Sequence, residues 1–428
     1  MVSEKKVWWG CGIFFVLVGI VLYLTAPGIG AHFEGDSLRY QALASQTGML
    51  SQLPLEVLGY PFFLWLLYAL FGVHVWIVVF AQILLGLACA WMIYRVTRRL
   101  VGPSAGAIVA IMWAGNLGFM IYSQLVLIEI ILALALALFV ERMVAYYDDP
   151  SVVRAVLAGG LLGLSVLLRP AALFFGPICA IGFLFCHRVA WRDRIVHAVV
   201  FAGLFYLPIV MYMVGVWTYF GIFALCPVMN VNLFIFFYPK LLRALQEGAL
   251  SVPVQLAAVI DYDIAHGTIS RSTQSALAQL MLQFPWITIK IWLINMLKTL
   301  GGFYSVEWKL YFGGLKISTS FFALSGSLVT RIYGYICGGM PHRWLCIPGF
   351  YEVWYLSVEY ITACIGCVWL GMQKKWWLMF FAAGYIVYFT AITGPDGSGR
   401  FRMMLEPWLL ALAVVGIWVL DKKIWRRS

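Results

Sequence analysis

The 428 residues are 63% hydrophobic and 11% charged, and their net charge is +11. An ordinary soluble domain is about 25% charged, so this composition excludes a soluble globular protein. The hydrophobic residues occur in runs of roughly twenty, the length at which a helix crosses about 30 Å of hydrocarbon. The sequence therefore predicts an all-α, polytopic integral membrane protein that forms a single domain over residues 1–428.

The positive charge is distributed unevenly along the chain. Basic residues flank the apolar runs in short clusters, at residues 5–6, 95–99, 188–194, 374–375 and 422–427. With Arg142 and Arg154, these loops hold 16 basic and 6 acidic residues, a balance of +10, whereas the rest of the chain has a balance of +1. Because short loops rich in Lys and Arg stay in the cytoplasm, this pattern predicts that both termini are cytoplasmic. Topology thus explains the charge, and a nucleic-acid partner is excluded.

The first expected span covers residues 7–26 and runs outward. Residues 27–72 follow as a first outer loop with juxtamembrane helices, and the apolar stretch 58–72 is short enough to lie in or dip into the outer leaflet. Further spans are expected at 74–94, 104–122 and 125–144.

Residues 155–186 contain a single charge, Arg169, which stands directly before Pro170. One helix of that length would reach about 48 Å, too long for an upright span. Proline also disfavours helix at the residue before it. We therefore expect two spans that turn at Arg169-Pro170 on the outer side, followed by a span at 195–216.

Residues 217–349 form an outer-face or interfacial region. An amphipathic helix is expected at 273–284, and 286–304 carries Lys290 and Lys298 on one face, which favours an interfacial helix. Whether 311–336 crosses the membrane stays open. Three final spans follow, at 353–372, 377–393 and 403–420, which gives ten spans, with twelve as the upper bound.

Ionisable residues at membrane depth are costly, so an unexplained one suggests a function. The candidates here all map to the outer ends of spans: Asp36, Glu129, Arg169, Arg400, Arg402 and Glu406. A transporter would place such groups near the midplane, around broken helices in related halves. This one-sided arrangement favours chemistry at the membrane surface.

Each candidate also has an ordinary structural explanation. Asp36 is a reasonable N-cap for a juxtamembrane helix, and Glu129 can hydrogen-bond within the bundle. Arg169 can extend to the interface as a snorkelling side chain. Arg400 and Arg402 can belong to a solvated turn, although two guanidinium groups after a glycine-rich approach also suit a lipid phosphate, which Arg grips bidentately.

Four stretches in chain order together resemble the protein-O-mannosyltransferase-like group of C-type glycosyltransferases, which includes the lipid A aminoarabinose transferase. They are Gly35-Asp36 with Tyr40, Gly59-Tyr60-Pro61-Phe62-Phe63-Leu64, Gly160–Leu168 leading into Arg169-Pro170, and Arg400-Phe401-Arg402 followed by Glu406-Pro407. Glu129 also matches a recurrent acid of this group.

The resemblance implies an inverting transfer of a sugar from a polyprenyl-phosphate donor at the outer face, with Asp36 acting on the acceptor. The family often has a second acid directly after this aspartate, whereas this chain has Ser37. Glu34 and Glu129 are the candidates to replace it.

The proposed chemistry needs a carboxylate that takes the acceptor's proton, a role we assign to Asp36. The leaving lipid phosphate needs charge stabilisation, which we assign to Arg400, Arg402 and Arg169. The supporting residues are Glu34, Tyr40, Glu129, Tyr60 and Lys298.

This donor requires neither a metal nor another cofactor, and the six histidines show no zinc-type spacing. The expected partners are membrane lipids, the polyprenyl-phosphate sugar and an acceptor lipid, glycan or protein. The expected location is a bacterial inner membrane, with the active site facing the periplasm. The alternatives are a transporter or flippase, a polymerase or ligase of lipid-linked glycans, and an assembly protein without chemistry.

Overall fold

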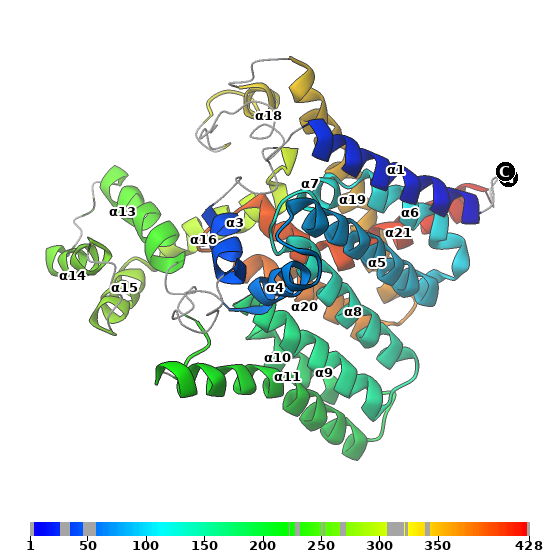
Figure 1. The fold of residues 1–428 in the computed structure, drawn as a ribbon, viewed down its shortest axis with the longest axis horizontal. Helices are drawn as coiled ribbons and strands as arrows, with labels where there is room; N and C mark the ends of the chain where they lie inside the picture. The colour runs from blue at the N-terminus through cyan, green and yellow to red at the C-terminus, as the bar shows by residue number, and fades with distance from the viewer. Residues whose placement is uncertain are drawn as a thin grey trace.

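The computed structural model describes residues 4–25, 35–45, 57–221, 223–226, 232–248, 250, 253–265, 271–305, 321, 324–338 and 343–425, and every regular element in these ranges is helical (Figure 1). The elements are α1 (Glu4–Thr25), α3 (Gly35–Ser45), α4 (Gly59–Phe71), α5 (Val75–Val101), η1 (Pro103–Ala105), α6 (Gly106–Gly115), α7 (Leu117–Tyr122), α8 (Glu129–Asp148), α9 (Val152–Leu168), η2 (Pro170–Ala172), α10 (Phe175–Leu184), α11 (Trp191–Phe220), η3 (Leu233–Phe237), α13 (Tyr238–Glu247), α14 (Val254–Ala265), α15 (Arg271–Gln283), α16 (Pro285–Gly301), α18 (Leu328–Cys337), η5 (Arg343–Cys346), α19 (Ile347–Met372), α20 (Trp376–Ile392), η6 (Gly399–Met404) and α21 (Glu406–Trp425).

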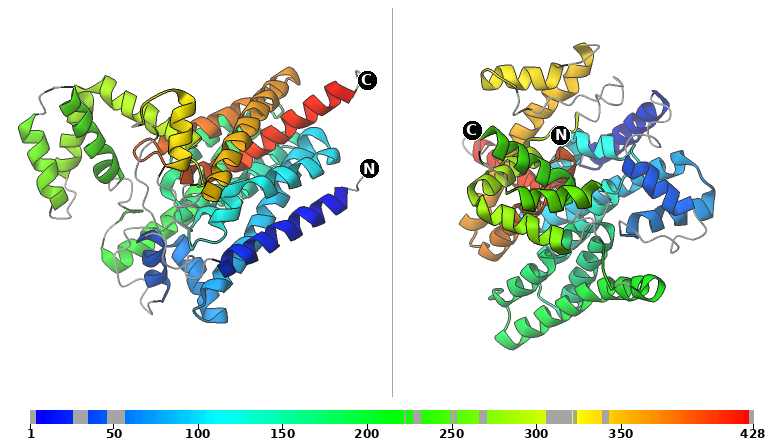
Figure 2. Two further views of the ribbon diagram at one scale, coloured as in Figure 1. Left: turned by 90° about the horizontal axis from the view of Figure 1, so that it is seen from above. Right: turned by 90° about the vertical axis from the view of Figure 1, so that its left-hand side faces the viewer.

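The long helices form one bundle. Helix α9 packs against both α8 and α11, α5 packs against α8 and α21, and α19 packs along α21. The first residues of α1 and the last residues of α21 lie at the same end of this bundle (Figure 2). Helices α13, α14 and α15 project from the bundle as a separate group (Figure 1).

We call the end that holds both termini the basic end. Its ion pairs converge on Glu141, whose side chain is fully buried. Arg95 Nη2 lies 2.9 Å from one oxygen of this carboxylate, and Arg142 Nε lies 2.7 Å from the other. The opposite end, where α8 begins at Glu129, is the site end.

Within the described residues, five helices are long and apolar enough to cross a membrane: Lys5–Leu24, Val75–Val101, Glu129–Asp148, Trp191–Phe220 and Ile347–Met372. A sixth arises if α15 and α16, which are bent by 98° relative to each other, form one broken span. The predicted class, an all-α multi-pass membrane protein, is therefore confirmed. Several other expected spans correspond to shorter apolar helices, such as Val152–Leu168 and Trp376–Ile392, so the count of ten remains a prediction.

Proline sets two of the turns. Helix α9 ends at Leu168, Arg169 is extended with φ −146° and ψ 120°, and Pro170 begins the next turn. The predicted break at Arg169-Pro170 is therefore present. Pro285 is the first residue of α16, and the preceding Phe284 leaves the helical region, which produces the sharp bend from α15.

Two glycines allow α19 and α21 to approach closely. A Cβ added at Gly416 would lie 1.9 Å from the carbonyl oxygen of Thr362, and one at Gly366 would lie 2.1 Å from the carbonyl oxygen of Leu412. Small residues at such contacts bring helix backbones together inside a membrane. The α19–α21 pair depends on this contact, and it holds η6, which directly precedes α21, at the site end.

We expect Gly416→Ala to destabilise the protein, because the new methyl group overlaps backbone that has no room to move. Overpacking of this kind typically costs about 1–3 kcal/mol. Thermal unfolding of the purified protein measures the effect. Gly203→Ala is the matched control, because a Cβ added there meets nothing within 4 Å; equal melting temperatures for the two variants would contradict the assigned contact.

Candidate active site

The site is built around the guanidinium group of Arg400 in η6. Its Nη1 donates to Asp36 Oδ2 at 2.8 Å, and its Nε donates to Glu129 Oε1. The Arg400 side chain is 9% exposed, that of Glu129 is 1% exposed and that of Asp36 is 29% exposed. One arginine thus joins a buried acid to an acid that solvent can reach, and the three residues come from distant parts of the chain.

Two further arginines flank this pair. Arg169 Nη1 lies 3.4 Å from Glu129 Oε1, and its guanidinium carbon lies 4.6 Å from the centre of the Phe401 ring. Arg39, one turn after Asp36 in α3, pairs with the other oxygen of Asp36. Burial alone would raise the pKa of Asp36, but Arg400 and Arg39 together hold that pKa below its usual value. Asp36 is therefore ionised at neutral pH.

Aromatic packing places α3 on the bundle. The Tyr40 and Tyr60 rings meet edge to face, with their centroids 5.0 Å apart. Tyr60 is fully buried, and its hydroxyl donates to Gln82 Oε1 at 2.9 Å. Gln82 in turn donates to the Leu125 carbonyl at 2.7 Å. This chain of contacts fixes the helix that carries Asp36 relative to the loop before Glu129.

Asp396 lies beside this cluster, in the turn between α20 and η6, and the sequence did not single it out. Burial raises the pKa of Asp396 above its usual value, although Lys240, Arg169, Arg400 and Lys298 all favour its charged form. Lys240 Nζ also donates to the Asp396 carbonyl at 2.7 Å. A group of cations therefore gathers from α13, α16, the α9–η2 turn and η6.

Arg402 lies in a different environment from Arg400. It is 0% exposed, and its Nη1 donates to the Gly302 carbonyl at 2.6 Å. Its Nη2 lies 3.0 Å from Glu352 Oε1, and its Nε lies 3.3 Å from Glu406 Oε1. The separation follows from the local helix, because residues two apart in a 3₁₀-helix of three residues per turn point in different directions.

The anions around Arg402 are themselves fixed by the fold. Glu406 accepts hydrogen bonds from Asn116 Nδ2 and from the Tyr304 hydroxyl, both at 2.9 Å. Glu352 accepts the backbone N–H groups of Tyr304 and Ser305. Arg402 therefore does not lie where an exposed phosphate ligand would lie. It connects α16, α19 and α21 inside the protein.

The remaining sequence candidates separate as follows. Four of them lie together: Asp36, Glu129, Arg169 and Arg400. Tyr40 and Tyr60 pack behind this group. Lys298 is near Asp396 and favours its charged form. Glu34 lies outside the described residues. The structure adds three residues that the sequence did not indicate: Gln82, Asp396 and Lys240. Each is an isolated polar or charged residue in the sequence, and its neighbours at the site come from distant parts of the chain. In the described part of the chain, no group of three or more His, Cys, Asp and Glu side chains is arranged to hold a metal.

We expect Arg402→Met to destabilise the protein, because it leaves Glu352 and Glu406 as buried, unbalanced carboxylates. Removing one partner of a buried ion pair typically costs about 3–5 kcal/mol. Arg192→Met, at an exposed arginine of α11, is the control and should unfold at nearly the wild-type temperature. A wild-type melting temperature for Arg402→Met would show that Arg402 does not stabilise the packing of α16, α19 and α21.

Residues 56–214, less than half of the chain, match the family model described as dolichyl-phosphate-mannose-protein mannosyltransferase. No curated protein matches the sequence. Among solved structures, the archaeal oligosaccharyltransferase AglB from Archaeoglobus fulgidus, in complex with an inhibitory peptide and a dolichol-phosphate, is similar at 12% identity with a TM-score of 0.53 over 100% of this chain. The apo form of the Archaeoglobus fulgidus enzyme gives 12% identity and a TM-score of 0.52 over 99% of this chain.

The chain spans about half the length of these structures, 52% and 51%. The matched segment contains Tyr60, Gln82, Glu129 and Arg169, whereas Asp36 and Arg400 lie outside it. The resemblance recognised in the sequence is confirmed: the chain has the fold of a C-type glycosyltransferase, and its residues 56–214 match the dolichyl-phosphate-mannose-protein mannosyltransferase family.

Proposed function

We propose that this protein is an inverting glycosyltransferase that moves a sugar from a polyprenyl-phosphate donor to an acceptor at the site end of the bundle. The observation that carries the proposal is the 2.8 Å pair between Arg400 and Asp36. It places a guanidinium group that can bind a phosphate next to a partly exposed carboxylate that can accept a proton. The family match and the fold support this function over a transporter, a flippase or an assembly protein.

The reaction follows from these two groups. The acceptor hydroxyl attacks the anomeric carbon, and its proton passes to Asp36. The bond between that carbon and the phosphate oxygen breaks, and the lipid phosphate leaves with the electron pair. Arg400, with Arg169 beside it, stabilises the charge that grows on the phosphate; fixed charges of this kind are usually the largest catalytic term.

The resting ion pair suggests how binding and basicity are connected. While Arg400 is paired with Asp36, it lowers the pKa of Asp36, which makes the carboxylate a weak base. A donor phosphate at Arg400 supplies a competing negative charge, and nearby negative charge raises a carboxyl pKa. Donor binding therefore makes Asp36 a better base at the moment when a base is needed.

We place the site on the outer face of the membrane, with the basic end in the cytoplasm. The distribution of Lys and Arg supports this orientation. The AglB structure was solved with a dolichol-phosphate and an inhibitory peptide, and we propose partners of the same two kinds here: a lipid-phosphate-linked donor and a separate acceptor. A bacterial inner membrane remains the proposed location.

We expect Asp36→Asn to abolish transfer while the protein stays folded and still binds the donor. Asparagine keeps the size of the side chain but cannot take the proton, and loss of a general base typically slows a reaction about 10²–10⁴-fold. The test measures transfer to acceptor and donor affinity on the same preparation. Near wild-type turnover would show that Asp36 has a structural role only and that the base lies elsewhere.

We expect Arg400→Gln to weaken donor binding about tenfold or more, because a hydrogen bond to a charged group is worth roughly 1.5–3 kcal/mol. Arg400→Lys should restore part of the affinity, since a point charge lacks the bidentate fork. Lipid-donor affinity in detergent or nanodiscs measures both. Arg331→Gln, outside the cluster, is the control; if Arg400→Gln binds the donor as Arg331→Gln does, the phosphate lies elsewhere, with Arg169 and Lys298 as the next candidates.

A further inference from the structure

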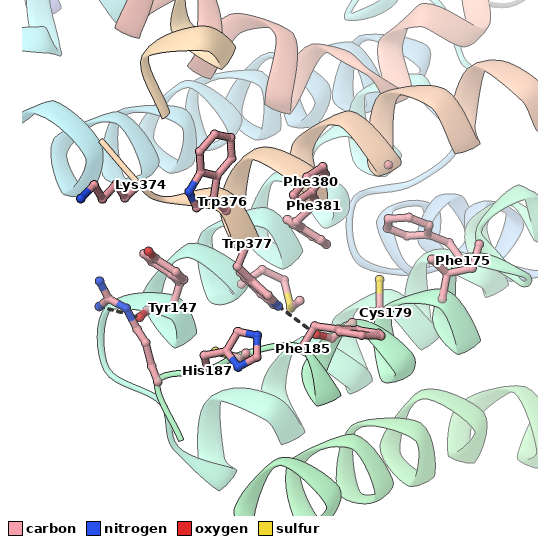
Figure 3. Close-up of a pocket in the computed structure, with 16 residues that line it drawn as sticks. Tyr147, Phe175, Cys179, Phe185, His187, Lys374, Trp376, Trp377, Phe380 and Phe381 are labelled. Atoms are coloured by element: carbon pink, nitrogen blue, oxygen red, sulfur yellow. Dashed lines mark hydrogen bonds between the residues drawn. The ribbon is translucent and has the colours of Figure 1, made fainter. Parts of the chain in front are cut away.

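A large apolar cavity runs along α10 and has a rim at the basic end of the bundle. Its volume is about 720 Å³, within the range of about 300–1,000 Å³ that is usual for ligand pockets. Its walls come from the last turns of α8, from α10 and from α20 (Figure 3). From Glu129 to Tyr147, helix α8 rises about 27 Å at 1.5 Å per residue, so the rim of the cavity at Tyr147 and the proposed active site lie at opposite ends of the same helix.

The walls of the cavity are aromatic and aliphatic. Phe175 and Cys179 come from α10, while Trp377 and Phe381 come from α20 (Figure 3). The opening is formed by side chains that the bundle leaves exposed: Phe185, Ile178, Trp376 and Phe380. In a membrane protein these exposed side chains face lipid, so the cavity opens toward hydrocarbon chains.

One rim of the cavity carries positive charge. Arg188 Nη1 donates to the Tyr147 carbonyl at 3.1 Å, and its guanidinium carbon lies 4.1 Å from the centre of the Tyr147 ring. Lys374 and His187 line the same rim and are exposed. The lining residues in the described chain include no carboxylate.

The rim is held in shape by the backbone around it. Lys374 has a left-handed φ of 57°, and its N–H donates to the Gly371 carbonyl at 2.9 Å in the turn that ends α19. Arg194 donates to the Val189 carbonyl at 2.8 Å and to the Leu184 carbonyl at 3.2 Å, which ties down the loop that carries His187 and Arg188. The backbone that carries Arg188 and Lys374 is therefore held at the mouth of the apolar slot.

We propose that this cavity binds an anionic phospholipid, with its acyl chains between α10 and α20 and its phosphate at Arg188 and Lys374. We choose this ligand because the positive charges of Arg188 and Lys374 match a negatively charged headgroup. Basic pockets between membrane helices bind anionic lipid headgroups. The bound lipid fills the gap between α8, α10 and α20 and so contacts all three helices.

Two variant pairs separate headgroup recognition from filling of the slot. Arg188→Gln with Lys374→Gln removes the rim charges, and Arg192→Gln with Lys422→Gln removes two exposed charges outside the cavity as the control. Gly384→Trp places a large side chain at a lining position where an added Cβ meets nothing within 4 Å, and Gly203→Trp does the same outside the cavity.

The experiment is native mass spectrometry of the purified full chain with equal amounts of phosphatidylglycerol and phosphatidylcholine that carry the same acyl chains. We expect phosphatidylglycerol to be retained preferentially, and the rim double variant to bind it about tenfold more weakly. Gly384→Trp should lose both lipids at this site, while the two controls bind as the wild type does. Melting temperatures show which variants are folded, and the two variants test the site independently.

Four results would overturn the proposal. Equal retention of both lipids, or equal losses in the rim variant and its control, would show that the charges do not recognise a headgroup. Displacement of phosphatidylglycerol by inorganic phosphate alone would make the rim a site for the free ion. Displacement by a prenyl phosphate at lower concentration would assign the slot to the donor lipid instead.

Discussion

The arrangement at the site end depends on the need to neutralise a nearly buried arginine. A guanidinium group that is 9% exposed requires anions and acceptors around it, and Arg400 finds them in Glu129 and Asp36. These residues belong to α8 and α3, so one side chain joins α3, the start of α8 and η6, the segment before the last helix. The pair also holds the proposed phosphate-binding group beside the proposed base, so the interaction that organises this end of the fold is the one that the proposed chemistry uses.

The two arginines of η6 have different surroundings, and we propose different roles for them. Arg402 is surrounded by Glu352, Glu406 and two backbone carbonyls. Arg400, two residues earlier, lies toward Asp36 and solvent. The rigid position of Arg402 between α16, α19 and α21 fixes the backbone of η6, which in turn fixes where Arg400 points.

Much of the fold could be predicted from local patterns. Apolar runs indicated the membrane helices, Pro170 indicated the break after α9, and the amphipathic stretch indicated α15 (Arg271–Gln283). The gathering of Asp36, Glu129, Arg169 and Arg400 at one end followed from their positions near the ends of spans. The separate roles of Arg400 and Arg402 could not be predicted, because they depend on the direction of side chains in a short 3₁₀-helix. The position of Asp396 beside the site could not be predicted either, because the hydrogen bond from Lys240 to the Asp396 carbonyl joins residues that are 156 apart in the sequence.

A structure of the full chain with a polyprenyl-phosphate sugar bound tests the central claim most directly. We predict that the phosphate lies within hydrogen-bond distance of the Arg400 guanidinium group, that Asp36 has moved off Arg400 toward the anomeric carbon, and that Arg402 keeps its contacts with Glu352 and Glu406. A phosphate located away from Arg400, with the Arg400–Asp36 pair still intact, would contradict it.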